Sequence, residues 1–144
     1  PGRDQLAEIF DDRGFDLAFA PATRFWSDPA IGFGNAVASR YPIRDRTVLQ
    51  LPASDDDLER RVALATAIET PWGLLGLACA HLNWKLHHGR VRDGDYVLAG
   101  YPQPSGIGRI EACRVVCDDA EDGVWPTDHF GVYAELRTEA LEFV

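Results

Sequence analysis

The order of apolar and polar positions along this chain predicts one helix followed by a series of short strands. Leu6, Ile9 and Phe10 recur at helical spacing, which predicts a helix over 5–12 that ends before Gly14. The apolar segment 16–20 predicts a strand, and the Pro- and Gly-rich segment 21–34 predicts a loop. Further strands are predicted at 35–39, 47–51, 96–99, 108–116 and 130–136.

The clearest pattern is a predicted hairpin over 61–82. Apolar or β-branched residues alternate with small ones from Val62 to Ile68, Pro71 and Gly73 occupy turn positions, and 74–82 is almost wholly apolar. A continuous apolar run indicates a strand that is covered on both faces. A layered α/β architecture or two stacked sheets would provide that cover.

Length and charge narrow the possibilities. With 144 residues, of which 46% are hydrophobic, the chain can form one core, so we expect a single domain over 1–144. The net charge of -9 disfavours long contacts with a nucleic-acid backbone, unless a bound divalent cation offsets it. The acidic run 54–59 predicts a solvated loop.

Cysteine content and hydropathy suggest a cytoplasmic protein. The three cysteines have no CxxC spacing, so we expect reduced packing residues. No segment approaches the roughly 18 to 20 apolar residues of a membrane span, and no signal-peptide pattern opens the chain. The chain begins at Pro1 and contains no methionine, so we expect residues upstream of it in the natural protein.

Two histidines lie where predicted strands end or begin. His81 closes the apolar run of the hairpin, and His129 follows Asp128 just before the last strand. A neutral imidazole is a natural proton acceptor near neutral pH, and a neighbouring carboxylate can orient it or bind a metal, so the pair indicates hydrolytic chemistry. The alternative is that each histidine is a structural residue at a strand end.

Other polar residues have weaker functional interpretations. His87 and His88 could join His81 in a zinc site, but the cysteines supply no matching spacing, so a solvated loop is the preferred interpretation. Arg40 and Arg61 could contact phosphate, although an arginine beside a strand is usually solvated or paired at the surface.

Four short motifs, in order, resemble the endonuclease/exonuclease/phosphatase superfamily, which is related to DNase I. The segment 34–43, GNAVASRYPI, resembles the family's GNAILSRxPI. His81-Leu82-Asn83 resembles its HLN strand end, and Asp95-Tyr96-Val97 resembles the tail of its RIDYI motif. Thr127-Asp128-His129 resembles its closing SDH.

The resemblance implies an α/β (α+β) fold of two packed, mostly antiparallel sheets flanked by helices, a four-layer sandwich. It also implies an enzyme, a hydrolase of phosphate esters that depends on Mg²⁺ or Mn²⁺ and acts as a phosphodiesterase, nuclease or phosphatase. The substrate would be a phosphoester and could be a nucleic acid.

The same resemblance assigns roles to individual residues. His129 would be the general base that activates water, and Asp95 would orient it. His81 would donate to a non-bridging phosphate oxygen, and Asp128 would bind the metal. Two asparagines would line the cleft as substrate-binding residues: Asn83 and Asn35.

The chain also departs from the family pattern. The early strands with an Asn and a Gln-Glu metal ligand are absent before Pro1, and no Gly-Asp-x-Asn segment precedes Asp95. We therefore expect an incomplete domain that lacks N-terminal strands and a segment between Gly94 and Asp95. The alternative function is a non-catalytic binding or scaffolding domain that keeps the fold without a complete metal site.

Overall fold

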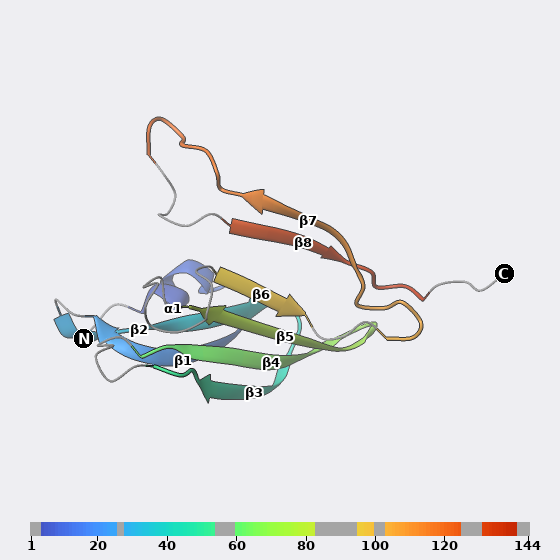
Figure 1. The fold of residues 1–144 in the computed structure, drawn as a ribbon, viewed down its shortest axis with the longest axis horizontal. Coiled ribbons are helices and arrows are strands. Elements are labelled where there is room, and N and C mark those ends of the chain that lie inside the picture. The colour runs from blue at the N-terminus through green and yellow to red at the C-terminus, as the bar shows by residue number, and fades with distance from the viewer. Residues whose placement is uncertain are drawn as a thin grey trace. The chain divides into compact units, whose positions relative to one another are not determined.

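The computed structural model describes residues 4–25, 28–53, 60–82, 95–99, 103–124 and 131–140. The chain divides into two compact units, Pro1–Ala99 and Gly100–Val144, and each is considered by itself (Figure 1). The expectation of one domain over 1–144 stays a prediction. The expected break between Gly94 and Asp95 lies outside the described residues, because Gly94 is not among them.

The first unit begins with a short helix, α1 (Gln5–Phe10), as the spacing of its apolar residues predicts. Asp4 caps it, because the side-chain Oδ1 accepts hydrogen bonds from the backbone N–H groups of Leu6 at 3.0 Å and Ala7 at 3.2 Å. The helix buries none of its residues, so it contributes nothing to the core.

A two-stranded antiparallel ribbon follows, formed by β1 (Asp16–Phe25) and β2 (Asp28–Ser39). The loop predicted over 21–34 is therefore wrong for 21–25 and 28–34, which are strand, and residues 26 and 27 lie outside the described residues. Pro21 and the glycines suggested a break, but the ribbon accommodates them with register shifts after Pro21 and after Arg24. Gly34 lies opposite Pro21, where a Cβ would be only 2.1 Å from the carbonyl oxygen of Ala20, so the strands approach closely because this residue is glycine.

The second sheet of this unit is four-stranded and antiparallel throughout, in the order β3-β4-β5-β6. Its strands are β3 (Ile43–Gln50), β4 (Val62–Thr70), β5 (Gly73–His81) and β6 (Asp95–Ala99). The predicted hairpin over 61–82 is confirmed as β4 and β5, with Thr70 paired to Gly73 at the turn.

The core of this unit lies between the ribbon and the sheet. Ala18, Ala20 and Val37 of the ribbon pack with alternate residues of β4: Val62, Leu64 and Ile68. Leu75, Leu77 and Cys79 extend this face along β5. Thr66 shares the buried face, and its hydroxyl donates to the carbonyl oxygen of Leu77 at 3.1 Å, so burial of the hydroxyl is compensated.

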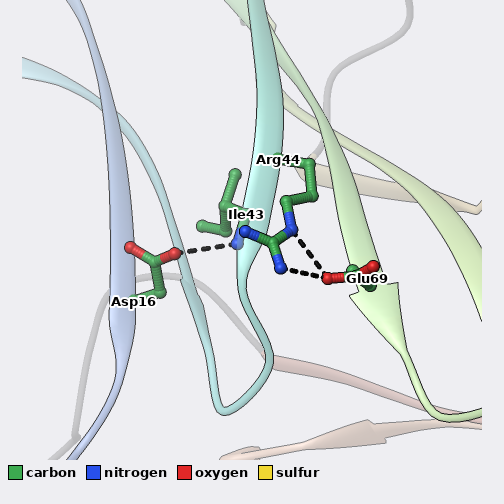
Figure 2. A network of polar contacts seen from close by, with 4 residues as sticks. All are labelled: Asp16, Ile43, Arg44 and Glu69. Carbon is green, nitrogen blue, oxygen red and sulfur yellow. Dashed lines mark hydrogen bonds and ion pairs between the residues drawn. The ribbon is translucent and has the colours of Figure 1, made fainter.

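Two polar contacts hold the start of β3, one to the ribbon and one to the neighbouring strand of the sheet (Figure 2). A carboxylate oxygen of Asp16 in β1 accepts a hydrogen bond from the backbone N–H of Ile43 in β3 at 2.8 Å. Arg44 of β3 forms a salt bridge with Glu69 of β4, in which Nε lies 2.7 Å from Oε2. Both members of this ion pair are more than half exposed, so we expect it to stabilise the fold only weakly.

The second unit contains an antiparallel hairpin of β7 (Ile110–Val116) and β8 (Gly131–Leu136). Both strands were predicted, and the predicted ranges, 108–116 and 130–136, begin two residues and one residue earlier than the observed strands. Arg137 closes one end of the hairpin, because its Nε donates to Glu111 at 2.8 Å and its carbonyl oxygen accepts the N–H of Gly108 at 2.8 Å.

The expected α/β sandwich with flanking helices is wrong for this chain. In the part that the structure describes, small antiparallel sheets predominate and α1 is the single, short helix. The apolar run of β5 suggested cover on both faces, but among the described residues the core cluster packs against the face toward the ribbon. The other face carries the small residues Gly76, Ala78 and Ala80, and Leu74 at its end is 63% exposed.

Candidate functional site

Four segments of the first unit meet at one end of the four-stranded sheet, the edge that its strand termini form. Because neighbouring strands are antiparallel, the end of β5 lies beside the start of β4 and the start of β6. The chain that leaves β3 also returns here, since the N–H of Leu51 donates to the carbonyl oxygen of Arg61 at 2.9 Å. This edge therefore gathers Arg61, His81 and Asp95 from distant parts of the sequence.

Arg61 and His81 form the polar centre of this edge. Nη1 of the guanidinium lies 3.0 Å from Nδ1 of the imidazole. Arg61 is only 6% exposed, and His81 is partly buried. A positively charged group with several N–H donors beside an imidazole is suited to recognising an anion such as a phosphate.

The ring of Phe33, on β2, also contacts His81. The two ring centroids are 6.0 Å apart and the planes are inclined by 62°, an edge-to-face arrangement. Phe33 belongs to the ribbon, whereas His81 belongs to the sheet. Phe33 therefore contacts the imidazole from the ribbon, whereas Arg61 contacts it from the start of β4.

His81 and Asp95 are directly paired residues in the register of β5 and β6. The two residues were predicted to share one site, and the backbone places them opposite each other. The role of Asp95 in orienting His129 stays a prediction, because it requires a residue outside the described part of the chain.

Asn35 lies near the same edge, in β2, but its amide has a structural bond. Nδ2 donates to the carbonyl oxygen of Val62 at 2.6 Å and so connects the ribbon to the first residue of β4. This bond explains the asparagine without a ligand. Its predicted contact with substrate stays a prediction.

Three predicted site residues lie outside the described residues: Asn83, Asp128 and His129. The convergence of His129 and Asp128 on His81 is therefore a prediction, as is the metal-binding role of Asp128. Within the described ranges, no group of three or more His, Cys, Asp or Glu residues could hold a metal ion. The residues described do not by themselves fit Mg²⁺ or Mn²⁺.

Cys79 lies two residues before His81, and its side chain faces the core. Its Sγ is 3.7 Å from the carbonyl oxygen of Ala36. Burial raises the pKa of this thiol, and a backbone hydrogen bond with Leu64 opposes the shift without cancelling it. Cys79 is therefore a protonated packing residue at neutral pH, which suits the sequence-based interpretation of it.

Arg61 is the residue that the sequence interpretation undervalued. An arginine beside a strand was expected at the surface, whereas this one is buried at the edge of the sheet. The turn between Thr70 and Gly73 supplies the missing signal. Counting outward from it along both arms of the hairpin places Val62 opposite His81, and Arg61 is the next residue along the chain.

Comparisons with known proteins identify no relative. No protein-family model matches the chain, and no curated protein and no solved structure matches it. In the described part of the chain, no helix is long and apolar enough to cross a membrane.

Proposed function

We propose that this chain is a hydrolase of phosphate esters, a phosphodiesterase, nuclease or phosphatase that uses Mg²⁺ or Mn²⁺. The single observation that carries the proposal is the buried Arg61 guanidinium bonded to His81, at the sheet edge where Asp95 is paired with His81. The resemblance of four ordered motifs to phosphoester hydrolases supports the same chemistry.

The chemistry of phosphoryl transfer explains why this pair matters. Negative charge spreads over the equatorial oxygens in the transition state, and cationic or N–H donors that are already in place stabilise it. Arg61 and His81 supply a full positive charge and a ring N–H at one location. A divalent ion would add positive charge when bound. The described residues do not by themselves form a site for this ion.

The remaining roles complete the proposal. His129 would take a proton from the attacking water, with Asp95 as the acceptor that orients its ring, and Asp128 would bind the metal. The net charge of -9 favours a small phosphoester over long duplex DNA. A cytoplasmic location belongs to the same proposal.

The test is hydrolysis of bis(p-nitrophenyl) phosphate by the full chain with Mg²⁺ or Mn²⁺. We expect turnover that EDTA abolishes and that falls about 10²- to 10⁴-fold in His129→Ala, the usual contribution of a general base. His81→Ala should also reduce kcat. His88→Ala serves as a matched control, because it removes an imidazole to which the proposal gives no role.

Absence of metal-dependent turnover in correctly folded protein would overturn the proposal. Retained binding of the phosphoester without turnover would instead support a non-catalytic binding domain.

A further inference from the structure

We propose that Arg61 is a positioning residue that holds His81 in the tautomer with its proton on Nε2. The inference begins with the 3.0 Å contact between Nη1 of Arg61 and Nδ1 of His81. A guanidinium carries five N–H donors and no acceptor, and it remains charged at all relevant pH values. Nδ1 must therefore accept the hydrogen bond, and the proton of the neutral ring is on Nε2.

The position of Arg61 makes this bond a durable constraint. Its side chain is 6% exposed, so water competes poorly for its donors. Its backbone is held as well, because its carbonyl oxygen accepts from the N–H of Leu51 and the next residue, Val62, begins β4. The guanidinium therefore reaches His81 from a fixed point of the sheet.

Phe33 limits the other freedom of the imidazole. A half-turn of a histidine ring about χ2 exchanges Nδ1 with Cδ2 and Nε2 with Cε1, so it would carry Nδ1 away from Arg61 and break this bond. The edge-to-face contact with the phenyl ring, with centroids 6.0 Å apart, restricts the tilt of the imidazole plane. The guanidinium thus selects the tautomer, and the phenyl ring restricts the orientation.

The consequence for chemistry is a neutral ring with a defined donor. An Nε2–H can donate to a phosphate oxygen while the positive charge remains on Arg61. This consequence for catalysis rests on the proposed function, but the tautomer itself does not. Beyond the positive charge that it brings to this location, Arg61 acts through its bond to His81, and His81 is the residue proposed to donate to the phosphate oxygen.

The test reads the tautomer directly by long-range ¹H–¹⁵N NMR of the full chain labelled at histidine. The His81 signals are assigned from their loss in His81→Gln. In the wild type we expect one tautomer, with a pyridine-like Nδ1 and a pyrrole-like Nε2. In Arg61→Gln, whose amide can donate or accept, we expect a mixture of both tautomers. Arg61→Lys, which can only donate, should restore the Nε2–H form.

Arg60→Gln is the matched control, because Arg60 is the exposed neighbour of Arg61 and its replacement should leave the spectrum of His81 unchanged. A proton on Nδ1 in the wild type would overturn the proposal, as would a pure Nε2–H tautomer in folded Arg61→Gln. If Arg61→Gln does not fold, the wild type and Arg61→Lys decide, because a mixed population in either contradicts the assignment.

The readout needs no turnover, so it separates this inference from the proposed hydrolase. An inactive protein with the Nε2–H tautomer would refute the enzyme and leave the positioning role intact. In an active protein, we expect Arg61→Gln to lower kcat more than it raises KM, and Arg61→Lys to recover part of kcat.

Discussion

Asp16 accepts a hydrogen bond from the backbone N–H of Ile43, and this 2.8 Å contact joins the ribbon to the edge strand of the sheet (Figure 2). Its other carboxylate oxygen accepts the N–H of Leu17 at 3.0 Å. We expect Asp16→Ala to lower the free energy of unfolding by about 1 kcal/mol, the net value of such a bond. Urea denaturation of the full chain measures the change.

Asp16→Asn tests the cause of that loss, because an amide oxygen can still accept the N–H of Ile43. It should retain more stability than Asp16→Ala. The exposed Asp118, replaced by alanine, controls for the loss of a surface carboxylate. Equal stability of Asp16→Ala and the wild type would show that the contact contributes nothing.

Leu64 and Leu74 lie in the same hairpin and differ in burial, so their alanine variants can be compared directly. Leu64 is fully buried between ribbon and sheet, whereas Leu74 is 63% exposed. Leu64→Ala should cost about 2–5 kcal/mol, because it removes apolar contacts and leaves a cavity. Leu74→Ala should change stability by no more than about 0.5 kcal/mol. Similar losses for both variants, measured by urea denaturation, would contradict the assigned core.

Gly34 and Gly32 both lie in β2 and differ in the space available for a side chain, so their alanine variants can also be compared. A Cβ at Gly34 would be 2.1 Å from the carbonyl oxygen of Ala20, and that backbone atom can retreat only if the strands separate. At Gly32, nothing lies within 4 Å of a Cβ. We expect Gly34→Ala to cost about 3 kcal/mol, at the upper end for overpacking, and Gly32→Ala to be neutral. A thermal shift that is the same for both would refute the close approach.

The raised pKa of Cys79 should slow its alkylation. Burial raises the pKa of its thiol, and the thiolate is the reactive form, so alkylation by iodoacetamide at pH 8 should be slower at Cys79 than at the exposed Cys113 and Cys117. Mass spectrometry of the labelled peptides measures the three rates. In urea the rates should converge, and slow labelling of Cys79 that persists there would contradict burial as the cause.

The same shift has a consequence for stability with a defined sign. A thiol whose pKa is raised in the folded state contributes stability that is fully present below its unfolded pKa. That contribution is lost as pH rises beyond about 8.5 and through the folded pKa. Cys79→Ser, which does not titrate in this range, should show a weaker alkaline decline than the wild type.

The sequence predicted the strands best where the alternation of side chains was strict. In β4 the apolar and β-branched residues 62, 64, 66 and 68 face one core, and every one is buried. The pattern failed at 21–34, because Pro21 and the glycines locally resemble a loop. The end of β1 and the start of β2 occupy this segment and pair with each other through two register shifts, which local composition does not reveal.

The candidate site was predictable in part. Strand ends and motif resemblance identified His81 and Asp95, whose pairing is set by the hairpin turn and the register of β6. The burial of Arg61 could not be predicted from its immediate neighbours, because it depends on what packs over the sheet edge. The flanking helices were expected from the resemblance, and the apolar run of β5 predicted cover on both faces, although Gly76, Ala78 and Ala80 are too small to reveal whether a face is covered.

Every strand pair in the described part of the chain joins neighbours in sequence, from β1-β2 to β7-β8. The β1-β2 and β4-β5 pairs are each joined by only two residues, so we expect these two hairpins to form early in folding, within microseconds. Docking the ribbon on the sheet, which joins Val37 to Leu64, should then be the slow event. Pulsed hydrogen exchange during refolding would detect protected hairpin amides before the core is complete, and simultaneous protection of all amides would contradict this order.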